Sequence, residues 1–193
     1  MVMVSRPGAS AERLVRLGLL FYAVLGALAV AWRVGLQGQA LWVVAGGSVR
    51  WVRDPALGVL AGSGVIFASG VFSRHSRMGA RLARRLAELL GPLSARQCWI
   101  LALASGVAEE AFFRGALQPV VGLTVASILF AGAHFVPRRE LAPWTAFSLV
   151  AGLLLGGLFE ATGNLVAPIV THVLVNGVNL NRLVRDYGTP SGG

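Results

Sequence analysis

The sequence is poor in cysteine and in charged residues. It has 193 residues, of which 13% are charged, and it contains no lysine and one cysteine, Cys98. A single cysteine excludes an internal disulfide framework and a cysteine-rich zinc site. The low charge, together with 55% hydrophobic residues and a mean hydropathy of +0.70, excludes an ordinary soluble domain. This composition is typical of a protein that crosses a membrane several times.

Long hydrophobic runs define the predicted spans, because a helix needs about 20 apolar residues to cross the hydrocarbon core. Six runs are close to this length: Val15–Ala31, Ala56–Phe72, Trp99–Gly115, Val120–Val136, Trp144–Phe159 and Leu165–Leu183. The predicted fold class is all-α, a polytopic transmembrane helical bundle with about six spans. We expect a single domain over 12–187, with disordered ends at 1–11 and 188–193.

Two apolar segments have a second interpretation. The stretch 36–49 is short and rich in glycine, so we interpret it as a re-entrant or interfacial piece. The first run also resembles a signal peptide, because "ALA" at Ala27–Ala29 is similar to a cleavage site. Since the remaining chain is itself predicted to be a membrane protein, we favour an uncleaved first helix.

The arginines predict the orientation of the chain. Only Arg33, Arg50 and Arg53 fall in loops on one side of the predicted spans, and the other arginines between spans fall on the opposite side. The positive-inside rule then places both termini in the cytoplasm. We expect an integral protein of a bacterial inner membrane.

The segment 75–91 has the pattern of an amphipathic surface helix. Its leucines and Met78 recur at helical spacing with arginines between them. Such a helix lies on the cytoplasmic surface, where anionic lipid attracts arginine. An arm that binds nucleic acid is the rival interpretation, but the segment has no aromatic residues between its basic ones, and we expect no nucleic-acid partner.

Four acidic or histidine side chains lie inside predicted spans, although the whole chain has only eight acidic residues and three histidines. They are Glu109, Glu110, His134 and His172. A charged group at the centre of a span costs about 2.5–3.5 kcal/mol, so such residues are presumed functional and face one another. Polar pairs that only hold helices together are the alternative.

Helix geometry suggests how these groups are paired. Glu110 and Arg114 are four residues apart in the favourable order for an ion pair, whereas Glu109 points about 100° away from Glu110. Glu109 is therefore the expected general base. His172 and Asn176 share a face and are expected to converge on Glu109. One tension is that His134 is expected near the cytoplasmic end of its span, with Glu109 ~15 Å inside its own.

Two chemistries fit this set of side chains. In the first, Glu109 with His134 activates water, and His172 with Asn176 stabilises the oxyanion of a peptide bond. In the second, Glu109, His134 and His172 are the ligands of a zinc ion. A serine or cysteine nucleophile is a weaker hypothesis, because nothing marks Ser105 as activated and Cys98 is remote.

Three motifs occur in order on successive hydrophobic segments: "EEAFFR" at Glu109–Arg114, "FAGAH" at Phe130–His134 and "HVLVN" at His172–Asn176. In this order they resemble the CPBP family of intramembrane proteases, also called the ABI family. That family includes the type II CAAX prenyl endopeptidases and bacteriocin-processing relatives. The resemblance covers roughly Trp99 to Asn181.

The resemblance implies a helical intramembrane endopeptidase in which Glu109 and His134 activate water. His172 and Asn176 would form the oxyanion site, with supporting roles for Glu110, Arg114 and Phe130. It favours a glutamate-type mechanism with no cofactor, while a divalent metal such as zinc stays open. The expected partners are the lipid bilayer and a membrane-anchored protein or peptide substrate, such as a bacteriocin or sorting segment. The alternatives are an ion- or proton-coupled transporter and a non-catalytic immunity or scaffold protein. The sequence assigns no oligomeric state.

Overall fold

The computed structural model describes residues 7–43 and 47–188. The described residues form helices connected by short loops, and their β-structure is limited to an isolated bridge between Val43 and Asn164. The elements are α1 (Pro7–Val30), the π-helix η1 (Ala31–Leu36), α2 (Arg53–His75), α3 (Arg77–Leu90), α4 (Ala95–Glu110), the π-helix η2 (Ala111–Leu117), α5 (Gln118–Ala133), the short 3-10 helix η3 (Arg139–Leu141), α6 (Ala142–Thr162) and α7 (Val166–Tyr187). The prediction of an all-helical fold is confirmed.

Four helical segments are long and apolar enough to cross a membrane. They are Ala11–Leu36, Arg53–His75, Ala95–Ala133 and Arg139–Thr162. Each of the six predicted apolar runs lies largely in a helix, but α7 is not among these four segments. The protein is thus a helical membrane protein by length and composition of its helices.

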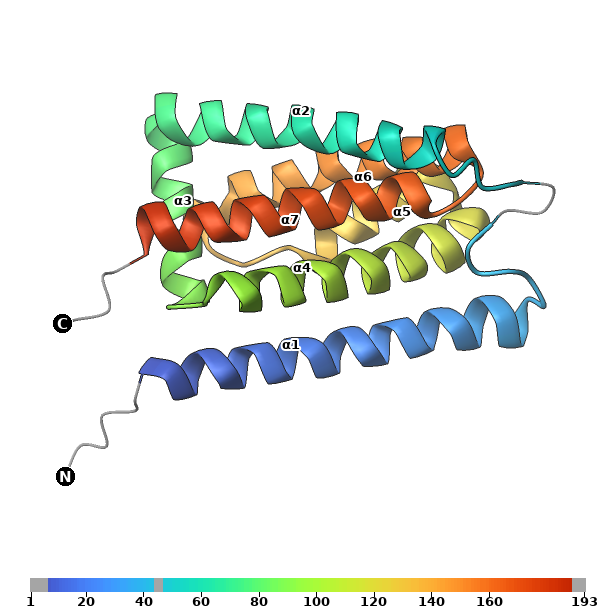
Figure 1. Ribbon diagram of the computed structural model, residues 1–193, viewed down its shortest axis with the longest axis horizontal. Coiled ribbons are helices and arrows are strands. Elements are labelled where there is room, and N and C mark those ends of the chain that lie inside the picture. Colours follow the sequence, from blue (N-terminus) through green and yellow to red (C-terminus); the bar gives the residue numbers. More distant parts are fainter. Residues whose placement is uncertain (1–6, 44–46, 189–193) are drawn as a thin grey trace.

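The long helices run along one another in a bundle, with α1 on its outer side beside α4 (Figure 1). α7 lies between α2 and α4 and contacts both. Close approach depends on glycine: a Cβ at Gly58 would lie 2.7 Å from the carbonyl oxygen of Ala167, and one at Gly106 would lie 2.6 Å from Val173. α7 is therefore the central helix of the bundle.

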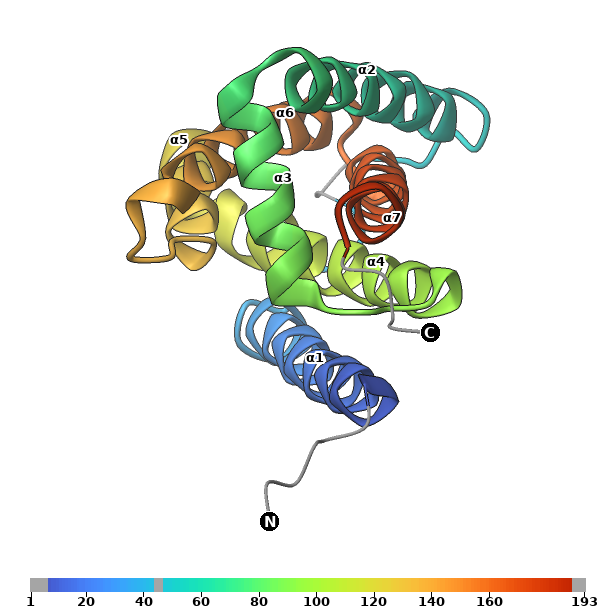
Figure 2. The same ribbon diagram turned by 90° about the vertical axis from the view of Figure 1, so that its left-hand side faces the viewer.

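The helix predicted around 75–91 is confirmed as α3, but its environment differs from the prediction. α3 crosses one end of the bundle (Figure 2) and buries Leu82 and Ala83, whereas Met78 and Leu89 remain about half exposed. A surface helix resting on lipid would bury its whole apolar stripe in the membrane. Here part of the stripe packs on α2 and α7 instead.

One prediction about the ends of the chain needs correction, and the interpretation of 36–49 as a re-entrant or interfacial piece stays a prediction. α1 begins at Pro7, inside the segment 1–11 that was expected to be disordered, because proline suits the first position of a helix. The remaining predicted ends, 1–6 and 189–193, lie outside the described residues. In the segment 36–49, Trp42 accepts a hydrogen bond from the backbone N–H of Leu165, at the end of the bundle opposite α3 (Figure 1), and 44–46 are not described.

The chain reverses at Gly122, which has φ 80° and ψ 167° within α5. The two arms of this hairpin are in register, because the Phe113 and Phe130 rings meet edge to face with centroids 5.1 Å apart and Leu117 shares a buried cluster with Ala126. Glu109 and His134 are nearly equidistant from the reversal. The same register therefore places Glu109 and His134 at the same depth in the bundle.

This register removes the tension between Glu109 and His134 that the sequence raised. α4 begins at Ala95, earlier than expected, and α5 ends at Ala133 after a short return from Gly122. His134 therefore lies inside the bundle and not at the cytoplasmic end of a full span.

Asp54 fixes the beginning of α2 at the end of the bundle opposite α3. Its side chain is fully buried and accepts hydrogen bonds from the backbone N–H of Arg50 at 2.9 Å, Arg53 Nε at 2.7 Å and Asn164 Nδ2 at 2.7 Å. Asn164 belongs to the turn between α6 and α7. One carboxylate thus joins α2 to the turn that positions α7.

Candidate active site

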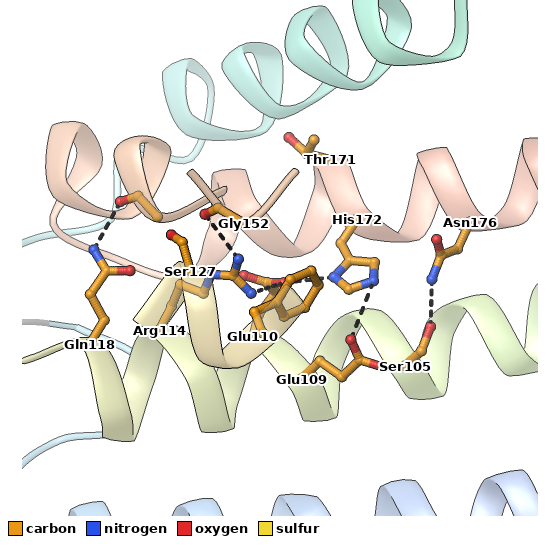
Figure 3. Close-up of polar contacts among 12 residues, drawn as sticks. Ser105, Glu109, Glu110, Arg114, Gln118, Ser127, Gly152, Thr171, His172 and Asn176 are labelled. Carbon is orange, nitrogen blue, oxygen red and sulfur yellow. Dashed lines mark hydrogen bonds and ion pairs between the residues drawn. The ribbon is translucent and has the colours of Figure 1, made fainter. Parts of the chain in front are cut away.

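Three helices bring the predicted site residues together. Glu109 lies in the last turn of α4, His134 caps α5 and His172 lies on α7. The distances from Glu109 Oε2 to His134 Nε2 and His172 Nε2 are 3.7 Å and 3.9 Å. Figure 3 shows Glu109, Glu110 and His172 facing one another between the helices. The hairpin at Gly122 positions the first histidine, and the close packing of α7 on α4 at Gly106 positions the second.

Both histidines are held through Nδ1. His134 Nδ1 lies 2.8 Å from the carbonyl oxygen of Phe130, and His172 Nδ1 lies 2.6 Å from Glu110 Oε1. A carbonyl oxygen only accepts hydrogen bonds, so Nδ1 of His134 carries the proton and donates it. The Nε2 atoms of both rings therefore face Glu109. This is the arrangement expected of imidazoles that exchange protons or ligate a reacting group.

Glu110 has a second partner that the sequence did not reveal. The predicted ion pair is present, with Arg114 Nη1 3.0 Å from Glu110 Oε1, but the same oxygen also accepts the hydrogen bond from His172. Arg114 in turn donates from Nη2 to the carbonyl oxygen of Gly152 on α6 at 3.1 Å. Glu110 thus contacts a site histidine in addition to pairing with the arginine, a contact that helix spacing alone did not reveal.

Asn176 does not reach Glu109 as expected. Its Nδ2 donates to Ser105 Oγ at 3.0 Å (Figure 3), and Ser105 Oγ donates to the carbonyl oxygen of Ala102 at 3.2 Å. Ser105 lies one helical turn before Glu109, so Asn176 is displaced by that turn along α4. The sequence singled out Ser105 only as a weak nucleophile, and its bond to Asn176 was missed.

The Phe130 ring packs against two groups of the site. The guanidinium carbon of Arg114 lies 4.4 Å from the centroid of the Phe130 ring, and the His134 ring centroid lies 4.5 Å away. Such a cation–π contact stabilises a desolvated arginine. The supporting residue Phe130 therefore contacts both the ion pair and a site histidine.

The site is desolvated, which strengthens every interaction within it. Glu109 and His172 are each 6% exposed and Glu110 is fully buried. Glu109 Oε2 and Glu110 Oε2 are buried without a hydrogen-bond partner among the described residues. Buried polar atoms are rarely left without a partner, so an orphaned carboxylate oxygen between two imidazoles indicates a position for water or substrate.

A cavity of about 40 Å³ borders the two site histidines and is lined by His134, Trp144, His172 and Asn176. A buried water needs about 10–15 Å³ and two to four polar partners. The cavity is large enough for water, and the imidazoles and the carboxamide supply the partners.

The alternative of a zinc site was based on Glu109, His134 and His172. Within residues 7–43 and 47–188, no group of three or more histidine, cysteine, aspartate or glutamate side chains has an arrangement that could hold a metal ion. The zinc hypothesis therefore receives no support from these side chains, and metal dependence stays a matter for measurement.

Comparison with known proteins shows which family these residues are similar to. The family model of the Rce1-like type II CAAX prenyl endopeptidases matches residues 91–178. This part of the chain is similar to that family. The match includes every predicted site residue, whereas α1, α2 and α3 lie outside the Rce1-like region.

A curated relative matches over a similar length. The uncharacterized protein YpbD of Bacillus subtilis (strain 168) is 42% identical over 80 residues, which is 40% of this chain and 41% of that protein. The chain thus spans about two fifths of the length of the curated relative it matches. No solved structure matches the chain.

Proposed function

We propose that the protein is an intramembrane endopeptidase that hydrolyses a peptide bond of a membrane-associated protein or peptide. The observation that carries this proposal is the orphaned Oε2 of Glu109, which lies 3.7 Å and 3.9 Å from the Nε2 atoms of His134 and His172. The similarity of residues 91–178 to a family of endopeptidases supports the same reaction class.

Water activation is assigned to Glu109 and His134. Because His134 uses its Nδ1 proton for Phe130, the neutral ring has a lone pair at Nε2 that can accept a proton. A water between this nitrogen and Glu109 Oε2 would lose its proton to one of the two bases as it attacks the carbonyl carbon. The same proton can then pass to the leaving amine.

Oxyanion stabilisation is assigned to His172 and Asn176. Since His172 Nδ1 donates to Glu110, its Nε2 can also donate only when the ring is an imidazolium. The charges of Glu109, Glu110 and Arg114 sum to one negative charge, so a protonated His172 makes the cluster neutral. An imidazolium and the Asn176 carboxamide would then supply two donors to the developing oxyanion.

The proposed topology has six spans, with α3 at the cytoplasmic end of the bundle and both termini in the cytoplasm of a bacterium. It is supported by the arginine distribution. The substrate would then be a peptide or protein anchored in the inner membrane. Peptide processing, as of a bacteriocin or sorting segment, is favoured over trimming of a prenylated protein.

The proposal is tested with purified protein in proteoliposomes and a panel of membrane-tethered reporter peptides. Glu109→Ala is expected to abolish cleavage while leaving insertion and folding intact. Glu12→Ala is the matched control, because Glu12 is an exposed glutamate at the start of α1. Cleavage of the reporter peptides by the Glu109→Ala variant would contradict the proposal. Ion flux through the liposomes that is lost in His172→Ala would favour a transporter instead.

A further inference from the structure

A second and larger cavity lies beneath α3. It has a volume of about 350 Å³ and is bounded by α2, α3, α6 and α7. Its walls are mainly apolar and include Phe72, Leu82, Leu86 and Phe147. The site cavity, at about 40 Å³, holds water but no amino-acid side chain. The larger cavity is of the size of known small-ligand pockets.

The two cavities are adjacent and share part of their walls. Val65, Trp144 and Phe147 line both of them. Trp144 stacks on Phe147 with centroids 5.9 Å apart, and it also contacts His134 with centroids 5.8 Å apart. A group in the larger cavity would therefore lie next to the imidazole that is proposed to activate water.

The larger cavity opens sideways and not through α3. Val150 on α6 and Ala68 on α2 line it, and both are exposed, Val150 by 66%. α3 covers the cavity and packs tightly on the end of α2, because a Cβ at Gly79 would collide with the backbone of Phe72. The opening thus faces the surroundings of the bundle between α2 and α6.

A small polar group interrupts the apolar wall. Ser69 Oγ lies 3.2 Å from Asn179 Oδ1 and 3.1 Å from the carbonyl oxygen of Ile66, and Ser69 and Asn179 line the cavity. The single hydroxyl proton of Ser69 is shared between these two acceptors, and Asn179 Nδ2 donates to no group within residues 7–43 and 47–188. An extended peptide has free carbonyl oxygens that accept such a bond, whereas a hydrocarbon chain has none.

We propose that this cavity binds an apolar stretch of the peptide substrate next to the bond to be cleaved, with Asn179 donating to its backbone. The inference rests on the proposed function, because it specifies the substrate of that same site. Apolar pockets with a few placed polar groups select bulky apolar side chains by burial and fix orientation by hydrogen bonding. Val65, Trp144 and Phe147 would form the passage between the bound stretch and the scissile bond.

The test measures binding and turnover separately. The probes are two membrane-tethered reporter peptides that differ only in four flanking residues, leucine in one and serine in the other. A photo-crosslinking amino acid at position 68, in a Glu109→Ala background, reports binding without turnover. The same amino acid at position 60 is the matched control, because Leu60 lies on α2, is 71% exposed and does not line the cavity.

We expect position 68 to crosslink the leucine peptide about tenfold more than the serine peptide, and position 60 to crosslink neither. In the otherwise unaltered protein, Ala68→Trp should lower kcat/KM for the leucine peptide about tenfold and leave kcat/KM for the serine peptide unchanged. Leu60→Trp should change neither. Asn179→Leu should weaken crosslinking of the peptide.

Three results would overturn the inference: crosslinks to lipid alone, equal crosslinks at positions 60 and 68, or an Ala68→Trp variant that keeps the leucine preference. Failure of the proposed function has a different signature. In that case the leucine peptide crosslinks at position 68 but is never cleaved, so binding in the cavity stands without proteolysis. Cleavage without crosslinking at position 68 leaves the protease proposal intact and removes the cavity from it.

Discussion

Two adjacent glutamates have different surroundings in the site. Glu109 presents an orphaned oxygen to two histidines, whereas Glu110 shares one oxygen between Arg114 and His172. Neighbouring residues on a helix point about 100° apart, so α4 alone separates their roles. Their contacts with α5 and α7 support the proposal that Glu109 is the base, and they place Glu110 in a hydrogen bond with His172.

Glu109→Gln is expected to lower reporter cleavage by about 10²–10⁴-fold, because a general base is lost. Its midpoint of thermal unfolding in detergent should stay close to that of the unaltered protein. Glu110→Gln should instead lower both activity and stability, since breaking a buried ion pair costs about 3–5 kcal/mol. Equal loss of stability in the two variants would contradict this division.

Ser105 is expected to act as a positioning residue for Asn176. Asn176→Ala should lower kcat by about 10²–10³-fold, the usual cost of one oxyanion donor. Ser105→Ala keeps the Asn176 side chain but removes the hydrogen bond that holds it. The value of kcat should therefore fall by a smaller factor, with KM unchanged. Ser105→Cys, which keeps a weak hydrogen-bonding group, should recover part of the loss. An unchanged kcat in Ser105→Ala would show that the bond to Asn176 has no role in positioning.

At the scale of the elements, the hairpin at Gly122 decides whether a site exists. Its φ of 80° with ψ of 167° is a conformation reserved for glycine, and the reversal there sets His134 against Glu109. α5 itself is an apolar helix that ends in the motif Phe130–His134, and this motif does not by itself set the depth of His134. The position of His134 therefore depends on one backbone conformation twelve residues earlier.

Gly122→Ala should destabilise the protein by about 1–3 kcal/mol and lower reporter cleavage, because the strained turn shifts α5 away from α4. Gly132→Ala is the matched control on the same helix, since a Cβ there meets nothing within 4 Å and its φ is ordinary. Thermal unfolding and cleavage should be unchanged in Gly132→Ala, or slightly improved in stability. Equal behaviour of the two variants would argue against the hairpin as the positioning element.

At the scale of the whole molecule, α3 and the Asp54 cluster close opposite ends of the bundle. Most arginines lie at the α3 end of the bundle. The orientation of the protein in the membrane therefore determines which side of the membrane the cavity beneath α3 faces. If α3 is cytoplasmic, the cavity beneath it opens in the cytoplasmic half of the membrane.

Orientation is tested by labelling with a membrane-impermeant maleimide in intact spheroplasts. In a Cys98→Ser background, Gln39→Cys should react from outside, because Gln39 is exposed at the end opposite α3. Glu88→Cys, exposed on α3, should react only after the membrane is opened. The reverse pattern would place both termini outside the cell.

The sequence by itself determined the helical membrane class, the six apolar runs, the helix at 77–90 and the ion pair of Glu110 with Arg114, because these follow from composition and from spacing within one helix. It also named Glu109, His134 and His172 through the three motifs. Only the tertiary structure decided what spacing along one helix cannot show. The reversal at Gly122 places Glu109 and His134 at the same depth in the bundle. The packing of α7 on α4 brings His172 to Glu110 and Asn176 to Ser105. These contacts join residues far apart in the chain, and helix packing, not local sequence, sets the distances between them.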